Sequence, residues 1–233
     1  MNAIAIVVGS LLGFSFQDWF TGDMRVMLFQ AIGLGTILIG LKMAWKLPDG
    51  YMLIFIFSLI LGGIFGELLH LDDFITAVSD ALKGAVGSEE STFTEGLITA
   101  FLLFCIGSMA IVGALEEGLT GDRELLLVKS MLDGFSSIAL AATFGSGVVF
   151  SVIPLLLFQG GITLLADKLK PLLSAEVVDT LSAVGGILII GISINLLKLG
   201  DVNLENLLPS LLFAVLMAKG YELFQRRSIS TTS

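Results

Sequence analysis

The stretch SMLDGFSSIALAATFGSGVVFSVIPLLLFQGGITLLA, residues 130–166, decides the fold class. It is 37 residues long, and Asp133 is its only charged residue. A helix of that length would extend about 55 Å, whereas the hydrocarbon core of a bilayer is about 30 Å thick. The stretch therefore predicts two transmembrane helices that turn at Gly145-Ser146-Gly147. The alternative is one long tilted helix followed by a re-entrant segment.

Similar apolar runs recur along the whole chain of 233 residues, of which 55% are hydrophobic and 14% charged. Soluble domains carry about 25% charged residues, so we expect an all-α integral membrane protein with a single transmembrane domain, residues 1–233. Residues 2–16 lack the basic region of a signal peptide, so they are expected to form the first helix. The pattern predicts eight transmembrane helices, over residues 2–16, 26–45, 51–69, 93–115, 125–144, 148–166, 180–197 and 204–221.

The connections between the predicted helices differ in their Lys and Arg content. One side of the membrane holds nine of the twelve and the other side holds three. Cytoplasmic loops carry the excess of these residues, so we expect both termini in the cytoplasm. The larger set contains Lys42, Lys46, Arg123, Lys129, Lys168, Lys170, Lys219, Arg226 and Arg227, and the smaller set contains Arg25, Lys83 and Lys198.

Residues 71–92 form the longest predicted connection on the other, outer side. Apolar residues recur in it at helical spacing, which predicts an amphipathic helix lying on the outer membrane interface. They are Phe74, Ile75, Ala77, Val78, Ala81, Leu82, Ala85 and Val86. Two roles are open for this helix, a lid or a tethered connector.

Residues 30–49 align without gaps with residues 182–201, with six identical positions in twenty. The two segments lie in the second and seventh predicted helices, which cross the membrane in opposite directions. Inverted repeats are typical of secondary transporters, which bind substrate near the bilayer midplane. The alignment therefore favours an inverted pair formed by helices 1–3 and 6–8, arranged around helices 4 and 5.

Asp133 lies about 12 Å into its predicted helix, where a carboxylate costs at least about 2.5 kcal/mol. It must be paired, protonated or in contact with water. Ser136 and Ser137 follow at i+3 and i+4, so we expect all three on one face. Glu116 ends the preceding helix, and two converging acids attract a cation or share a proton. Asp133 and Glu116 are therefore the candidate metal ligands, and the alternative is a hydrogen bond from Lys129 to Asp133 that serves only packing.

Gln159, which follows Pro154, and Asn195 are uncharged polar residues inside predicted helices. Their side-chain oxygens make them candidate neutral ligands, although such residues also join helices without binding anything. The sequence contains no G-x-S-x-G, H-E-x-x-H or nucleotide-binding motif. We therefore expect neither an enzyme nor a bound cofactor. The lone Cys105 excludes a disulfide within the chain, and the net charge of −9 argues against nucleic-acid binding.

Four segments carry a resemblance to a known family. They are NAIAIVVGSLLG (2–13), FTEGLITAFLLFCIGSMAIVGALEEGLTGD (93–122), KSMLDGFSSIALAATFGSGVVFSVIPLLLFQGGITLLA (129–166) and SAVGGILIIGISINLL (182–197). They resemble the bacterial membrane-protein family catalogued as domain of unknown function 554. The resemblance covers almost the whole chain and implies a multi-pass protein of the bacterial inner membrane. It implies no activity.

A second resemblance concerns mechanism. The segment GGILIIGISINLL, residues 185–197, is similar to the last helix of the bacterial manganese efflux pump family. That similarity implies an inverted-repeat cation exporter in which Asp133 matches the acid of the second repeat. The acid of the first repeat has no counterpart in the first three predicted helices, so Glu116 would take its place.

These observations lead us to expect a secondary transporter or exporter of a small cation. Asp133 and Glu116 would bind the cation or a coupling proton, and Gln159 and Asn195 would add neutral ligands. The expected partners are the lipid bilayer and the small cation or proton. A passive channel formed by a homodimer and a non-transporting scaffold or sensor are the alternatives, and the short connections argue against the scaffold.

Overall fold

A computed structural model describes residues 1–16, 21–87 and 91–230, and every regular element in that part of the chain is a helix. The helices are α1 Asn2–Ser15, α2 Gly22–Ala44, α3 Met52–Leu68, α4 Leu71–Val86, α5 Phe93–Cys105, α6 Ser108–Thr120, α7 Glu124–Phe144, α8 Gly147–Phe150, α9 Val152–Leu164, α10 Ala166–Leu169, α11 Ala175–Leu196, α12 Leu204–Leu207 and α13 Ser210–Ser230. The predicted all-α fold is confirmed.

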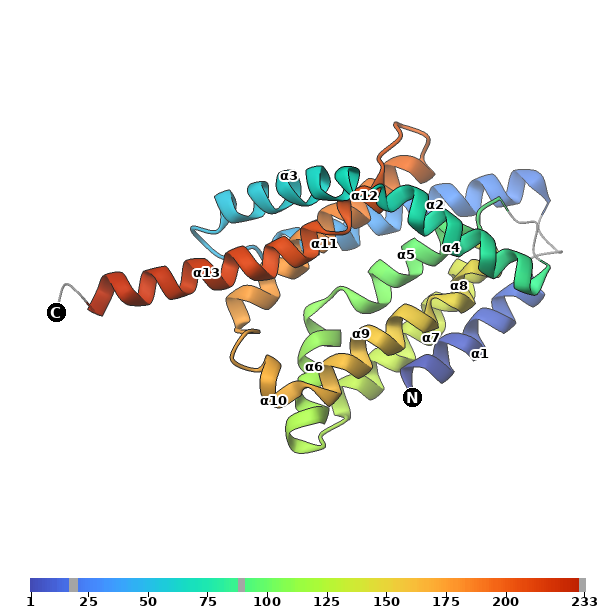
Figure 1. The fold of residues 1–233 in the computed structure, drawn as a ribbon. Helices are drawn as coiled ribbons and strands as arrows, with labels where there is room; N and C mark the ends of the chain where they lie inside the picture. The colour runs from blue at the N-terminus through green and yellow to red at the C-terminus, as the bar shows by residue number, and fades with distance from the viewer. Residues whose placement is uncertain (17–20, 88–90, 231–233) are drawn as a thin grey trace.

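The long helices form two groups (Figure 1). In one group, α2 packs along α11, and α3 packs along α13. In the other group, α1 packs along α7, and α6 packs along α9. Helix α5 lies between the groups and contacts α7 and α9 on one side and α11 on the other.

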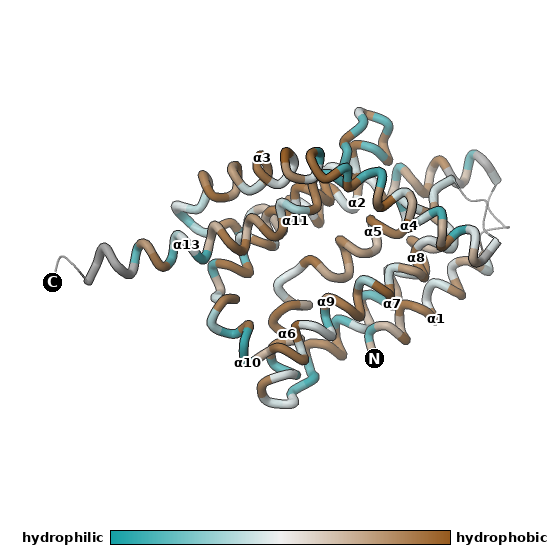
Figure 2. The backbone as a smooth tube through the Cα atoms, viewed as in Figure 1, coloured by the Kyte–Doolittle hydropathy of each residue, from teal (hydrophilic) through white to brown (hydrophobic). Residues whose placement is uncertain are grey.

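The outside of the molecule is apolar along these helices. Figure 2 shows hydrophobic residues along the long helices, whereas hydrophilic ones gather near the turns. Met131, Phe135 and Leu157 are 68%, 76% and 75% exposed. A soluble protein rarely exposes large apolar patches. An apolar surface of this kind suits helices that contact lipid.

The stretch of 37 residues quoted above folds as predicted into separate helices. Helix α7 ends at Phe144, and Gly145 has a φ of +81°, a left-handed conformation that glycine adopts without strain. The chain then re-enters a helix at Gly147 and, after Ser151, continues as α9. The alternative of one long tilted helix is wrong.

The predicted fourth helix, residues 93–115, is wrong in one respect, because the structure breaks it into α5 and α6 with a bend of 60°. The break lies at Ile106 and Gly107, whose backbones are extended. A cause is visible at Gly185 of α11, where a Cβ atom would lie 2.1 Å from Cγ2 of Ile106. Ile106 therefore occupies a notch that the missing side chain of Gly185 provides.

Five helices of the described part are long and apolar enough to cross a membrane, or up to seven if each of two bent helix pairs counts as one span. Helix α1, with 14 residues, is shorter than each of these five. The number of eight therefore stays a prediction, as does the inverted repeat. The two segments that carry the repeat do lie together, because α2 and α11 pack antiparallel, with Thr36 Oγ1 2.7 Å from Ser193 Oγ.

The predicted amphipathic helix is present as α4, which is bent by 65° from α3. Residues 88–90 of the predicted segment lie outside the described part. Phe74, Ile75, Val78 and Leu82 line an apolar groove against α5 and α9. The location of α4 at the membrane interface and its role as a lid or a connector stay predictions.

Candidate functional site

Asp133 is buried on α7 and only 3% exposed. Its carboxylate forms an ion pair with Lys129, one turn earlier on the same helix. Nδ2 of Asn2, on α1, donates a hydrogen bond of 2.9 Å to Oδ2 of Asp133. We call Lys129 and Asp133 the central pair. Their side chains are 11% and 4% exposed, so the pair is largely shielded from solvent.

The ammonium of Lys129 also contacts the end of α5. It donates a hydrogen bond of 3.4 Å to the carbonyl of Leu103 and lies 5.9 Å from the centre of the Phe104 ring. The last carbonyls of a helix lack partners within the helix. Because α5 stops at Cys105, the carbonyl of Leu103 is available to Lys129. The ammonium is thus surrounded by a carboxylate, a main-chain carbonyl and an aromatic face, which are three groups that bind cations.

Asn2 connects the central pair to Gln159 of α9, because its Nδ2 also donates to Oε1 of Gln159 at 3.3 Å. Two polar atoms of these residues remain buried without a hydrogen-bond partner, Oδ1 of Asn2 and Nε2 of Gln159. Such atoms cost about 1–3 kcal/mol each when unsatisfied. An unpaired acceptor beside an unpaired donor gives this site the capacity to bind a polar ligand or water.

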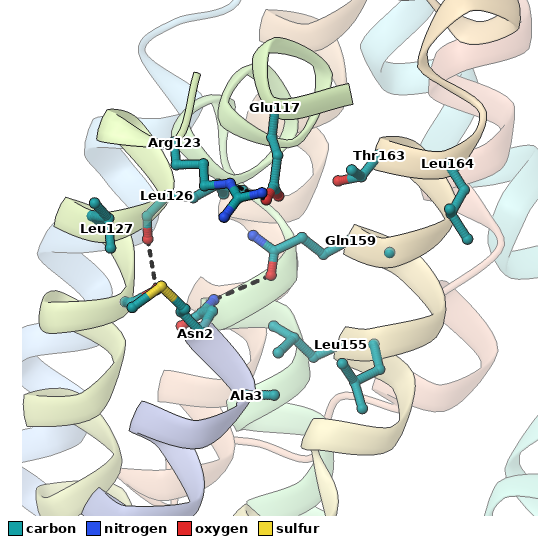
Figure 3. A pocket seen from close by; sticks show the side chains of 14 residues that line it. Asn2, Ala3, Glu117, Arg123, Leu126, Leu127, Leu155, Gln159, Thr163 and Leu164 are labelled. Atoms are coloured by element: carbon teal, nitrogen blue, oxygen red, sulfur yellow. Dashed lines mark hydrogen bonds and ion pairs between the residues drawn. The ribbon is translucent and has the colours of Figure 1, made fainter. Parts of the chain in front are cut away.

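Asn2 and Gln159 line a cavity of about 410 Å³, which we call the α1 cavity. Figure 3 shows the amide of Gln159 directed toward the ion pair of Arg123 with Glu117. Nε of Arg123 lies 3.1 Å from Oε1 of Glu117, and the Arg123 side chain is 65% exposed. The α1 cavity therefore extends from a solvated ion pair down to Asn2, which contacts the central pair.

Two of the predicted site residues, Asp133 and Gln159, are joined through Asn2, whereas the serines separate. Ser137 is buried and donates a hydrogen bond of 2.7 Å to the carbonyl of Gly134. Ser136 is exposed, so its predicted place on the Asp133 face is wrong. The buried residues of α7 recur at spacings of three and four, and Ser137 falls in this series whereas Ser136 does not.

Glu116 is half-buried on α6, and it is Glu117, the following residue, that lines the α1 cavity. The bend between α5 and α6 changes the direction of the helix that carries Glu116. Among the described residues, no group of three His, Cys, Asp or Glu side chains is arranged to hold a metal ion. The metal-binding role of Asp133 and Glu116 stays a prediction.

Asn195 is not with Asp133 but at the end of α11, where it holds a loop. Its Nδ2 donates to the carbonyl of Val202 at 2.9 Å, and its Oδ1 accepts from the Val202 N–H at 2.8 Å. The two bonds replace the pairing that the loop backbone lacks. The signal for this role is a polar residue within one turn of a helix end, followed by a short loop.

Asn195→Ala is expected to lower the free energy of unfolding by about 2 kcal/mol, because two backbone groups of Val202 lose their partner. Thermal unfolding in detergent checks this. Leu199→Ala is the control, since Leu199 lies in the same loop and is 74% exposed. If Asn195→Ala unfolds like the native chain but fails to bind a transported cation, Asn195 is a ligand after all.

A second polar cavity, which we call the α5 cavity, lies at the start of α5 and has a volume of about 530 Å³. Thr94, Glu95 and Thr99 of α5 line it, together with Asn195 and the loop before α12. Thr92 Oγ1 donates a hydrogen bond of 2.9 Å to the carbonyl of Phe144, the last residue of α7. The α5 cavity is therefore at the end of α7, and the α1 cavity is at its start.

The pairing of Lys129 with Asp133 was predicted as an alternative, from their i, i+4 spacing. The break after α5 and the role of Thr99 were not predicted. The break at Ile106 carries no local signal, because a single glycine such as Gly107 within an apolar run is tolerated in membrane helices. Thr99 carries no signal, because a threonine in an apolar helix usually bonds to its own backbone.

A model of the family described as "Protein of unknown function (DUF554)" matches residues 1–219. The chain is 36% identical over 213 residues to "Uncharacterized membrane protein YdfK" of Bacillus subtilis (strain 168), which covers 91% of this chain and 90% of that protein. It is 29% identical over 220 residues to "Uncharacterized protein YqgA" of Escherichia coli (strain K12), with 92% and 93% covered. No solved structure matches the chain.

Proposed function

The chain belongs to the DUF554 family of proteins of unknown function, and from that premise and the geometry of the site we propose that it is an integral membrane protein that transports a small cation. The apolar helices and the relative named a membrane protein support the membrane location. The asymmetry of Lys and Arg supports a bacterial inner-membrane protein with both termini in the cytoplasm. The α1 cavity would then open toward the cytoplasm.

One observation carries the proposal: the central pair lies between two polar cavities at opposite ends of α7. This helix has 21 residues and is therefore about 30 Å long. Asn2 links the pair to the α1 cavity. Thr99, in the α5 cavity, is one turn from Leu103, whose carbonyl accepts from Lys129. A closed ion pair between two accessible cavities is the arrangement that alternating access requires.

Lys129 would act as a tethered competitor of the transported cation. A cation that arrives at Asp133 takes the place of the ammonium, and the return of Lys129 to the carboxylate releases it. Lys129 gives up its proton to water in one of the cavities as it leaves the carboxylate, so a monovalent cation replaces one positive charge with another and no isolated ion is buried. The break between α5 and α6 supports this mechanism, because discontinuous helices supply carbonyl groups to ions in transporters. A proton carried by the same pair would serve as the coupling ion.

The test is transport by the purified protein in liposomes. Na⁺, K⁺, Mg²⁺ and Mn²⁺ are supplied one at a time with an imposed proton gradient, and internal cation and pH are followed by fluorescent dyes. We expect one cation to accumulate against its own gradient while protons move in the opposite direction. Movement that only follows the electrochemical gradient would favour a passive channel. Absence of flux for all four ions in a folded preparation would contradict cation transport and favour a scaffold or sensor.

A further inference from the structure

Among the residues that the structure describes, the α5 cavity is lined by acidic side chains and by no basic one. Asp72, Glu95, Asp201 and Glu205 contribute its charge. Glu95 also lines an adjoining cavity of about 350 Å³ and therefore lies where the two meet. Acidic residues alone can form a solvated surface that binds no ion. A binding site would also contain a buried polar group without a partner.

Thr99 provides that sign. It is 0% exposed, it lines the α5 cavity, and its hydroxyl has no hydrogen-bond partner. Thr36 and Thr143, in other helices, instead bond to a backbone carbonyl of their own helix. A buried hydroxyl without this bond has a free oxygen for a ligand. Glu95 is four residues earlier and so lies on the same face of α5.

Two of the other acids, Asp72 and Asp201, differ from Glu95 in their surroundings. Oδ2 of Asp72 accepts a hydrogen bond of 3.1 Å from Nδ2 of Asn203, and Oδ1 of Asp72 accepts one from the Asp73 N–H. Asp72 is thus bound to the loop that closes this end of the molecule. Asp201 is exposed. Glu95 is the acid on the same helix face as the unpartnered hydroxyl.

We infer that Glu95 and Thr99 form a second cation site, which takes a hydrated divalent cation in the α5 cavity. An opening lined with several acids raises the local concentration of cations, and it does so more steeply for double than for single charge. The ion keeps most of its water, because no three carboxylate, His or Cys side chains converge on it in the described part of the chain. Magnesium-like ions are commonly bound in this way, through one or two carboxylates and several waters.

The second site can exist without the proposed function, but its role in transport rests on that function. Thr99 lies one turn from Leu103, where Lys129 is bound. An ion bound at Glu95 would therefore lie along α5 from the central pair and could move from this site to that pair. In this arrangement the second site loads the transporter from the side opposite to the α1 cavity.

The test is direct counting of bound Mn²⁺ on the purified full chain in detergent, since the electron paramagnetic resonance signal of free Mn²⁺ is lost on binding. We expect saturable binding that Mg²⁺ competes away. Glu95→Gln should raise the Kd about tenfold, as loss of a partner of bound metal typically does. Thr99→Val should raise it about threefold, the value of one hydrogen bond. Asp49→Asn, a matched acid-to-amide control at an exposed residue that does not line the α5 cavity, should change it about twofold or less.

The double variant Lys129→Met/Asp133→Asn separates this site from the central pair and should retain the saturable Mn²⁺ binding that Glu95→Gln weakens. The inference is overturned if the native chain shows no saturable binding, or if Glu95→Gln and Thr99→Val bind as it does. Binding that depends on Asp133 and not on Glu95 also overturns it, while supporting the proposed function. Binding that depends on Glu95 in a chain that transports nothing supports the inference and contradicts the proposed function.

Discussion

Asp133→Asn is expected to abolish cation transport and to lower the free energy of unfolding by about 3–5 kcal/mol. The variant leaves the ammonium of Lys129 buried without a negative charge beside it, next to neutral groups that include the Leu103 carbonyl and the Phe104 ring. An isolated buried charge is far more costly than a paired one. Cation flux in liposomes and thermal unfolding in detergent measure the two effects separately.

The double variant Lys129→Met/Asp133→Asn is the control for folding. It removes both charges, and replacing a buried ion pair with neutral groups is often neutral for stability. We expect it to recover most of the lost stability while remaining unable to transport. Ser136→Ala, on the exposed face of the same helix, should match the native chain in both measurements. A double variant that still transports would make the pair a structural contact and contradict the proposed mechanism.

Helix content was predictable because it depends on local composition. Apolar runs bounded by short polar segments indicate membrane helices whatever their tertiary contacts are. The turn at Gly145 could be predicted for the same reason, since two glycines interrupt an apolar stretch that is too long for one span. The break at Ile106 could not, because it depends on a notch at Gly185, about eighty residues later in the chain.

The site was predicted only in part for a related reason. Asp133 is conspicuous as the one charge in an apolar stretch, and its burial confirms that it is not a surface residue. Which residues surround it depends on how α1, α5 and α9 pack, and periodicity within one helix does not report that. Ser136 and Ser137 show the limit, because both lie within one turn of Asp133 and only the rotation of α7 against α1 separates them.

Gly40→Val is expected to lower the free energy of unfolding by about 3 kcal/mol, the upper end of the usual cost of overpacking. A Cβ atom at Gly40 would lie 2.5 Å from the carbonyl oxygen of Gly186, and one at Gly186 would lie 2.6 Å from that of Gly40. The obstructing atoms are backbone atoms of α2 and α11, so no side-chain rotation relieves the contact. Membrane helices associate through such close approach, because lipid supplies no hydrophobic drive for one helix to bind another.

Gly35→Val on the same helix is the matched control, since a Cβ atom there meets nothing within 4 Å. It should leave the unfolding temperature in detergent close to the native value, because valine is no worse a helix former than glycine. Gly186→Val should repeat the loss caused by Gly40→Val, since the two glycines face each other across one crossing. If Gly40→Val and Gly35→Val unfold alike, α2 and α11 do not pack at this crossing. The predicted inverted repeat would then lose the contact that brings its two segments together.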